Sequence, residues 1–345
     1  MNELAQGDAK VGEGRDVFAE FVEGFFGAIA SELADPSVSE ILINGPGQVF
    51  VERKGKLEPS PHRFSCEAEL LCALRSVAQF LGRPLGPGQP ILEGRLPDGS
   101  RLQAVLPPLA EGGPCVAIRR HRVDSLTFEQ LVETDAISAQ GVELLRAAVL
   151  KKKNILVSGG TGSGKTSLLR CIASLSPADE RIVTIEDARE LHLQLPHVVS
   201  LEGRPGDARG RGGVSIGDLF VATLRLRPDR IVIGELRGGE ALDLIQAMTS
   251  GHGGCLSTVH ASSAPDALRR LETMALYRGI DLPLAALRSQ VASAVDLIVQ
   301  VERTSSGRRW VAGVSEVLPL DNAGGYQSRV VMRRDEMGQL RGEQL

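Results

Sequence analysis

The spacing of apolar residues changes near the middle of the chain. Between residues 16 and 33 apolar side chains recur every three or four positions, which predicts an amphipathic helix. From about residue 138, short apolar runs alternate with longer helical stretches, a rhythm typical of strand–helix units. We therefore expect two domains of different architecture, which a length of 345 residues allows. The apolar positions of the first helix are Phe18, Phe21, Val22, Phe25, Phe26, Ile29 and Leu33.

The first half of the chain predicts a small α+β domain over residues 16–120. A Gly-Pro-Gly turn at 45–47 separates two short strand candidates, and a second helix precedes two more strands. Residues 1–15 are glycine-rich and charged and indicate a mobile tail, and residues 121–137 are interpreted as a linker. After the first helix, the expected elements are strands at 40–43 and 48–53, a helix at 67–81, and strands at 101–106 and 116–120.

The second half predicts an α/β domain over residues 138–345. The alternation of strands and helices favours a parallel sheet flanked by helices, which binds ligands at the carboxyl ends of its strands. The segment after about residue 319 carries one further strand candidate at 326–333 and no motif. The expected parallel strands are 154–158, 181–185, 230–234 and 255–259.

A phosphate-binding loop follows the first of these strands. Residues 159–166 fit the pattern G-x-x-x-x-G-K-[ST], and a helix is expected directly after them. Glycines let the backbone wrap around phosphates, and the helix N-terminus adds a positive dipole end. Lys165 is expected to reach the β- and γ-phosphates and Thr166 to ligate Mg²⁺. The predicted nucleotide-binding residues of this loop are Gly159, Gly160, Thr161, Gly162, Ser163, Gly164, Lys165, Thr166 and Ser167.

Two carboxylates stand at the ends of later strands. Glu186 follows the apolar run 182–185, and Glu235 follows 230–233. Gly234 takes the position where the usual motif has Asp, so Glu235 must either polarise water or organise the metal. Acids at solvated strand ends are common, but two of them beside one phosphate loop favour a hydrolytic site.

Two of the six histidines bracket the strand at 255–259. A His at a strand end beside a γ-phosphate can donate a hydrogen bond and so sense that phosphate. For His252 or His260 taken alone, a capping or packed histidine is the favoured interpretation. Their spacing does not indicate a metal site.

Composition narrows the functional classes. A net charge of −4 and an aromatic content of 3% disfavour nucleic acid as a partner, because single-strand channels need cations and stacking platforms. No apolar run approaches the length of a membrane span, and the first residues do not resemble a signal peptide. The five scattered cysteines contain no C-x-x-C pair and are interpreted as buried, reduced thiols. We expect a cytoplasmic protein.

Over about residues 35–317 these segments resemble the hexameric secretion ATPases of type II and type IV systems and of type IV pili. The resemblance rests on four ordered boxes: the phosphate loop, the acidic box 184–187, the atypical Walker B segment 227–237 and the histidine box 251–261. Segments 43–46, 95–101, 118–120 and 224–229 look most like the tight-adherence (Flp) pilus branch. The four-cysteine zinc module of many type II secretion ATPases is absent from the sequence, and the N-terminal extension is short for a tight-adherence ATPase.

The resemblance implies a RecA-like P-loop NTPase domain with a smaller N-terminal domain. It implies Glu235 as the catalytic acid, Glu186 as a residue that places metal or water, and His260, with His252 less clearly, near the nucleotide. Arg95 and Arg101 fall where this family's N-terminal domain supplies cations to the phosphates. ATP and Mg²⁺ are the implied cofactors. The implied partners are a homo-hexamer and inner-membrane platform proteins, through which the protein is peripheral to the inner membrane.

Three functional classes stay open at this point. A mechanical ATPase that powers pilus assembly or protein secretion is favoured. A DNA-transfer or other nucleic-acid motor is the alternative that composition disfavours, and a nucleotide-gated module with little turnover is opposed by Glu235. The basic, glycine-rich segment 203–213 is interpreted as a solvated mobile loop, although contact with the nucleotide, a neighbouring subunit or nucleic acid is also open.

Overall fold

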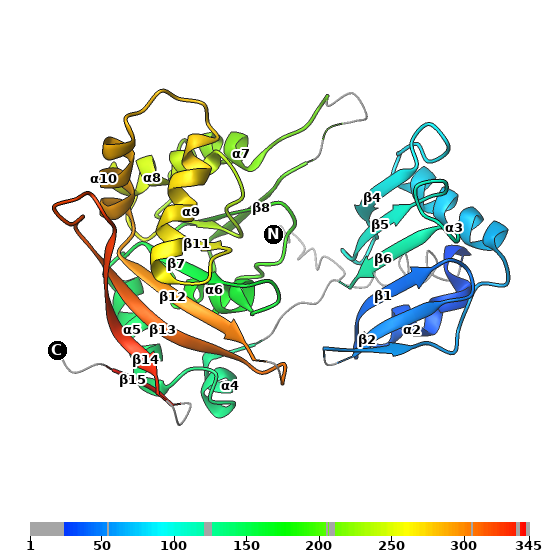
Figure 1. Ribbon diagram of the computed structural model, residues 1–345, viewed down its shortest axis with the longest axis horizontal. Coiled ribbons are helices and arrows are strands. Elements are labelled where there is room, and N and C mark those ends of the chain that lie inside the picture. Colours follow the sequence, from blue (N-terminus) through cyan, green and yellow to red (C-terminus); the bar gives the residue numbers. More distant parts are fainter. Residues whose placement is uncertain are drawn as a thin grey trace, which may run out of the picture. The chain divides into compact units, whose positions relative to one another are not determined.

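The computed structural model describes residues 24–53, 55–120, 126–204, 206, 211–304, 306–335 and 339–342, and the chain divides into two compact units, Met1–Arg122 and Val123–Leu345 (Figure 1). The expected tail at 1–15 and the beginning of the first expected helix lie outside the described residues. Each unit has its own sheet and its own core. Among the described residues, no helix is long and apolar enough to cross a membrane.

In the first unit the described strands form one antiparallel six-stranded sheet in the order β3-β2-β1-β6-β5-β4. The four strands predicted from the sequence are confirmed. The sequence did not reveal β3, whose residues are all exposed, or β4, which contains a glycine and follows a proline. The strands are β1 Val38–Asn44, β2 Val49–Arg53, β3 Lys56–Pro59, β4 Ile91–Arg95, β5 Arg101–Val105 and β6 Cys115–Arg119.

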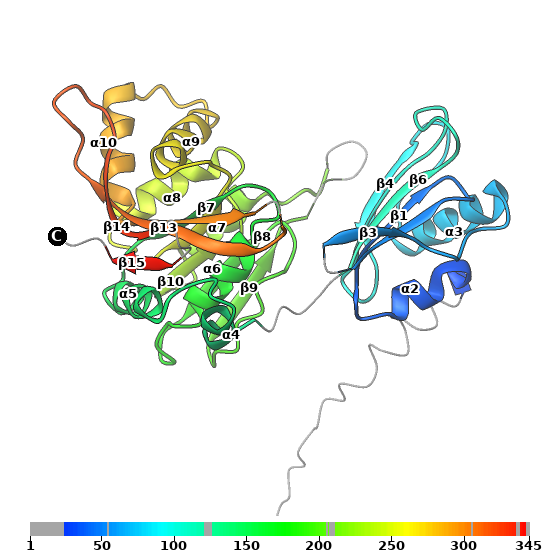
Figure 2. The ribbon, with the colours of Figure 1, turned by 60° about the horizontal axis from the view of Figure 1, so that its bottom comes forward.

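Helices cover one face of this sheet, as Figure 2 shows for α2 (Ala30–Ala34) and α3 (Glu67–Phe80). The predicted helix at 67–81 is confirmed. In place of one continuous first helix, the described residues form a 3-10 turn, η1 Gly27–Ile29, followed by the short α2. Gly27 in the interior of that segment weakens a continuous helix. Phe26, Ile29 and Leu33 nevertheless enter the core, as their spacing predicted.

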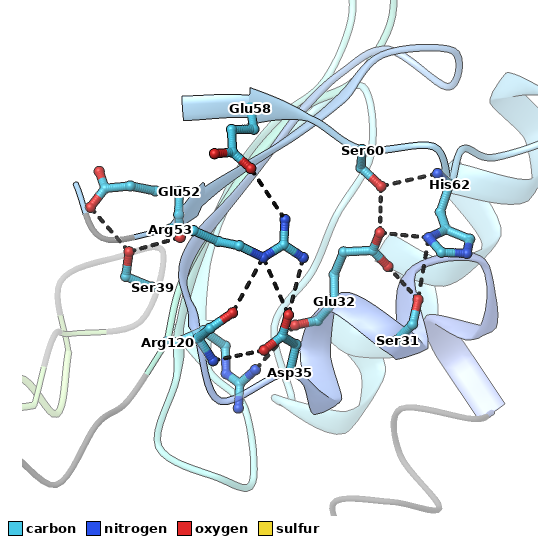
Figure 3. Close-up of polar contacts among 11 residues, drawn as sticks. Ser31, Glu32, Asp35, Ser39, Glu52, Arg53, Glu58, Ser60, His62 and Arg120 are labelled. Atoms are coloured by element: carbon cyan, nitrogen blue, oxygen red, sulfur yellow. Dashed lines mark hydrogen bonds and ion pairs between the residues drawn. The ribbon is translucent and has the colours of Figure 1, made fainter. Parts of the chain in front are cut away.

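A polar cluster fastens α2 to the turn after β3 (Figure 3). The Glu32 carboxylate, buried at 3% exposure, accepts hydrogen bonds from Ser31 at 2.7 Å, from Nδ1 of His62 at 2.6 Å and from Ser60. These hydroxyl and imidazole donors lower the pKa of Glu32 against the effect of burial, which raises it. Ser31 and Glu32 both contact Nδ1 of His62, whereas a nucleophilic triad uses the two ring nitrogens for different partners. The cluster therefore has a structural role.

The cysteines differ from expectation. Within the described residues all five thiols are free, but only Cys171 and Cys255 are buried. Cys66, Cys72 and Cys115 are exposed on the first unit, so the expectation that all five are buried is wrong for these three. Cys66 stands at the N-cap of α3 and Cys115 begins β6, positions at element ends where side chains reach solvent.

In the second unit the described strands form one nine-stranded sheet in the order β15-β14-β13-β12-β7-β11-β10-β8-β9. The six strands from β12 to β9 are parallel, and β13 to β15 extend the sheet antiparallel. All five predicted strands are confirmed; β9, β12, β13 and β15 are additional. The strands are β7 Ile155–Gly159, β8 Ile182–Glu186, β9 Val198–Glu202, β10 Arg230–Ile233, β11 Leu256–Val259, β12 Leu297–Arg303, β13 Arg309–Leu318, β14 Gln327–Arg334 and β15 Leu340–Gly342.

Helices cover both faces of this sheet. Side chains from α7 to α10 and alternate strand residues form one core, and those from α4 to α6 form the core on the opposite face (Figure 2). Helix α4 lies within the segment 121–137 that the sequence indicated as a linker. Its Phe128 is buried in the second core, so this part of the segment packs as part of the second unit. The helices are α4 Phe128–Glu133, α5 Ala139–Leu150, α6 Lys165–Ala173, α7 Ile216–Thr223, α8 Glu240–Thr249, α9 Ala264–Leu276 and α10 Leu284–Ala294.

The glycine-rich segment 203–213 joins β9 to α7. At its base Arg204 and Val214 exchange backbone hydrogen bonds of 2.9 and 2.7 Å, and the Arg204 side chain donates to the carbonyl of Gly212 at 2.8 Å. Residues 205 and 207–210 lie outside the described part. The described ends of this loop are therefore held together like the base of a hairpin.

Candidate active site

The predicted phosphate loop joins the carboxyl end of β7 to the N-terminus of α6. Gly162 and Gly164 have φ angles of +70° and +92°, a left-handed conformation that glycine adopts without the penalty of a side chain. Gly164 is the N-cap of α6, and no side chain caps the first-turn N–H groups. These donors, together with the positive end of the helix dipole, suit a phosphate.

The first glycine of the loop is required by close packing. A Cβ on Gly159 would stand 2.4 Å from the carbonyl oxygen of Val301 in β12 and 2.7 Å from the Ser163 hydroxyl. Ser163 in turn donates to the carbonyl of Gly160 at 2.8 Å, within the loop. Any larger residue at 159 would therefore displace either the loop or β12.

Lys165 is buried at 6% exposure, and its ammonium lies at the loop backbone. It donates to the carbonyl oxygens of Gly159 at 3.1 Å and Gly160 at 2.9 Å. Burial lowers the pKa of this lysine, whereas the nearby Glu235 carboxylate acts in the opposite direction. The ammonium stands 3.2 Å from Nδ1 of His260, which links the loop to the end of β11.

His260 connects Lys165 to Glu235. Because an ammonium can only donate, Nδ1 of His260 must accept from Lys165, and the proton of the neutral ring then resides on Nε2. Nε2 lies 2.5 Å from Oε1 of Glu235, so it donates to that carboxylate. Burial first, and then the Lys165 charge, lower the pKa of His260, which favours this neutral form. The sequence predicted Lys165 in the loop after one strand and Glu235 and His260 after two others. The structure joins the three side chains into one chain of hydrogen bonds.

Arg237 completes the surroundings of Glu235. Its Nε donates to Oε2 of Glu235 at 2.5 Å, and its Nη1 lies 3.1 Å from the Asp187 carboxylate. Glu235 thus accepts from a histidine on one oxygen and from an arginine on the other. Arg237 belongs to the Walker B segment, but nothing in its spacing revealed that it would turn back onto Glu235.

Glu186 occupies the space beside Gly234. A Cβ on Gly234 would stand 3.0 Å from Cγ and 3.3 Å from Oε1 of Glu186. The Glu186 carboxylate is buried at 3% exposure and accepts backbone N–H bonds from Glu190 at 2.9 Å and Leu191 at 3.0 Å. Burial raises its pKa to about 7, although those N–H donors oppose the effect. Glycine at 234 thus leaves room for a carboxylate that reaches the same place from β8.

The loop and its neighbours suit a nucleotide with a divalent cation. The flexible glycines, the uncapped N-terminus of α6 and the Lys165 ammonium offer donors to phosphate oxygens. Thr166 and Ser167 lie half-buried in the first turn of α6 and supply hydroxyls. Hydroxyl and carboxylate oxygens are the ligands that Mg²⁺ prefers, so Thr166 and Glu186 have the right donor chemistry to hold it.

His252 lies near the amino-terminal ends of the parallel strands, away from the phosphate loop at their carboxyl-terminal ends. It precedes β11, whereas His260 follows that strand, and Gly253 beside it approaches Lys152 at the start of β7. Nδ1 of His252 is buried without a hydrogen-bond partner among the described residues. The expected place of His252 near the nucleotide is therefore not supported, because a whole strand separates it from the phosphate loop. The eight-residue spacing gave no sign of which histidine would lie at which end of the strands.

Arg95 and Arg101 belong to the first unit and pair directly across β4 and β5. Arg119 on β6 pairs with Arg101 in the same register, so three arginines form one row across adjacent strands. This row lies on the face of the sheet away from the helices, since the alternate residues Leu102 and Ile118 are buried in the core. Arg119 lies in the segment 118–120 that carries part of the resemblance, but nothing in the sequence indicated its place in this row.

Over residues 26–317 the chain matches the family described as Type II/IV secretion system protein. A putative conjugal transfer protein of Mycobacterium tuberculosis is 36% identical over 295 residues, covering 84% of this chain and 83% of that protein. A type IV secretion system protein PtlH homolog of Bordetella bronchiseptica is 38% identical over 297 residues, covering 79% and 87%. The X-ray structure of the Legionella pneumophila ATPase DotB shares the fold, with a TM-score of 0.57, 20% identity, and coverage of 89% and 82%.

The match to the family spans most of the chain and includes the phosphate loop, the carboxylates at the ends of β8 and β10, and the histidine at the end of β11. The fold that the chain shares with DotB comprises a RecA-like domain and a smaller N-terminal domain. The chain belongs to the type II/IV secretion system ATPase family and is an ATPase of that family.

Proposed function

We propose that the protein hydrolyses ATP with Mg²⁺ to power assembly of an Flp-type type IV pilus or protein secretion through a type II/IV secretion machine. The observation that carries the proposal is the chain of contacts from Lys165 through His260 to Glu235, at 3.2 and 2.5 Å, beside the phosphate loop. This arrangement joins a phosphate-binding cation to a carboxylate able to accept a proton. The membership in a secretion ATPase family supports the mechanical role.

In the proposed reaction the loop N–H groups and Lys165 hold the phosphates, and Glu235 accepts a proton from the attacking water. Water oxygen bonds to the γ-phosphorus as the bond to the ADP oxygen breaks. Thr166 and Glu186 would hold Mg²⁺, which would supply positive charge to the phosphate oxygens. Arg237 and His260 orient the Glu235 carboxylate through its two oxygens.

A second candidate function is DNA transfer, because one relative at 36% identity is described as a putative conjugal transfer protein. Purified protein should hydrolyse ATP only with Mg²⁺, and turnover should rise with a polytopic membrane partner but not with single-stranded DNA. Stimulation by single-stranded DNA alone would favour the DNA-transfer function. Absence of Mg-dependent turnover in every arm would contradict both.

We also propose that the protein acts as a homo-hexamer, located in the cytoplasm and held at the inner membrane by platform proteins. Ring assembly through closing, heterologous contacts would let each subunit act on its neighbour. Sedimentation velocity with a non-hydrolysable Mg-ATP analogue at micromolar protein should show the ring. A monomer at all concentrations would count against it.

The arginine row of the first unit extends the proposal. Arg95 and Arg101 are proposed to contact the phosphates in the nucleotide-bound protein, where developing negative charge requires cations beyond Lys165. Replacing both by alanine should reduce turnover more than nucleotide affinity, and should remove ATP-dependent compaction in small-angle scattering. A double variant that compacts and hydrolyses like the wild type would show that these arginines are surface charge.

A further inference from the structure

A hairpin near the end of the chain approaches the phosphate loop. Strand β7 lies between β11 on one side and β12 on the other, so the loop after β7 borders both (Figure 1). On the β12 side, Nη1 of Arg303 stands 3.3 Å from where a Cβ of Gly162 would lie, and Cδ of Arg309 stands 3.5 Å from the same point on Gly164. The β12–β13 hairpin, orange in Figure 1, thus brings two arginines to the two left-handed glycines of the loop.

These two arginines face each other across the hairpin. Arg303 and Arg309 are direct partners in the β12–β13 register, and side chains at directly opposite positions share one face of a sheet. Like charges in this arrangement destabilise a strand pair. Both residues are exposed, and within the described part of the chain neither guanidinium has an ion pair or hydrogen bond. The register therefore holds two positive charges together with no negative group between them.

Two arginines near this hairpin, Arg308 in its turn and Arg334 at the end of β14, already have partners. Arg308 pairs with Asp135 at 3.1 Å, and Arg334 pairs with the same carboxylate at 3.4 Å. Both guanidinium groups also lie over the Trp310 ring, at 5.4 and 4.8 Å from its centroid. This cluster anchors β13 to residues 134–136, so the hairpin is fixed in place while Arg303 and Arg309 remain available.

We propose that Arg303 and Arg309 bind the phosphates of the nucleotide held by the loop. A phosphate group would neutralise the paired charges, and guanidinium groups suit it because they donate two parallel N–H bonds. Their side of the loop is the one opposite Lys165, His260 and Glu235, so cations would meet the phosphates from both flanks. The inference rests on the proposed ATP hydrolysis and adds a nucleotide-binding pair from outside the four sequence boxes.

The test is nucleotide affinity as a function of phosphate number. The double variant Arg303→Gln/Arg309→Gln should bind a fluorescent ATP analogue about 10-fold or more weakly than the wild type, with a smaller loss for ADP and the smallest for AMP. The Arg303→Lys/Arg309→Lys variant should recover part of the affinity. The matched control Arg329→Gln/Arg341→Gln removes two exposed arginines from β14 and β15 of the same sheet and should bind like the wild type.

ATP affinity within two-fold of the wild type in the double variant would overturn the inference. So would an equal loss for ATP and AMP, which would indicate a distorted loop. Normal ATP affinity with loss of ring assembly in sedimentation would instead assign the pair to a subunit contact. A wild type that binds ATP without hydrolysing it would contradict the proposed function while leaving the binding pair intact.

Discussion

At the amino-terminal end of β10 in the ATPase sheet, the Arg230 side chain is fully buried. Just beyond the carboxyl-terminal end of the same strand, Glu235 keeps 18% of its side chain exposed. Arg230 is held by Glu180 and donates to the carbonyl of Val149 at 2.7 Å. Glu235 shares its oxygens between Arg237 and His260, which are themselves 61% and 41% exposed. Strand β10 thus begins with a buried ion pair and is followed by a carboxylate whose partners are partly exposed.

The difference separates two uses of charge. A buried ion pair is costly to break, because removing one partner leaves the other uncompensated. Partly exposed charges can change partners, since water replaces what is lost. The histidine box spans both ends of the parallel strands, with His252 at one and His260 at the other. Variants at the two ends should therefore fail in different ways.

The largest effect is expected at Lys165. Lys165→Ala removes the one cation within the loop and the donor to Nδ1 of His260. ATP turnover should fall below about 1% of the wild type, as for loss of a principal electrostatic contact. The check is steady-state phosphate release, with the fold verified by circular dichroism. Undiminished turnover in a folded variant would contradict the role of the loop.

The next effect is expected at Glu235. Glu235→Gln keeps the shape but removes the proton acceptor, so hydrolysis should fall by about 10²-fold or more while ATP binding is spared. Equilibrium binding and single-turnover hydrolysis, measured on the same preparation, separate the two. If both fall equally, Glu235 has a metal or structural role, and Glu186 becomes the candidate base.

Glu186 should couple stability to pH. Burial raises its pKa from 4.5 to about 7, so the folded state binds the proton more tightly than the unfolded state. Stability should then fall as pH rises from about 4.5 through 7, by at most about 3 kcal/mol from this group. Relative to wild type, Glu186→Gln should show a flatter dependence in urea unfolding between pH 5 and 8. Parallel curves for the two proteins would contradict the raised pKa.

The smallest effect is expected at His252. His252→Ala at the amino-terminal end should leave ATP turnover within about two-fold of wild type, a change of less than about 0.5 kcal/mol in activation free energy. His260→Ala is the matched variant at the carboxyl-terminal end and should lower turnover much further. Equal losses in the two variants would show that the two ends do not divide as the contacts suggest.

Much of this fold follows from local patterns. The four central parallel strands, β7, β8, β10 and β11, are continuous runs buried on both faces, and the loop carries its own glycine and lysine pattern, so both were predicted from the residues. The strands that escaped prediction are edge strands, antiparallel strands, and β12, which joins the parallel part of the sheet to the antiparallel part. In β9 all but the last residue are half-buried, and in β13 buried positions are few, so their burial pattern gives a weak signal.

Contacts between segments far apart in the chain could not be predicted from the sequence. Gly234 stands where the usual motif has an aspartate, and the position of Glu186 beside it gives the structural reason for a glycine there. Arg237 and the pair Arg303 and Arg309 are ordinary arginines in the sequence, since their placement depends on strand register and on how loops turn back. Spacing along the chain identified the groups that carry the chemistry but not the partners that orient them.

Strand β15 is the last described strand of the ATPase sheet to be synthesised. Leu340 of β15 belongs to the same core as α5 and lies against Gly141 of that helix. The first unit has all its described strands by Arg119, so it can fold while the rest is still being made. Helix α5, which begins at Ala139, emerges from the ribosome about two hundred residues before Leu340 does. The part of α5 around Gly141 that Leu340 covers stays exposed for that interval, which is when a chaperone would bind it.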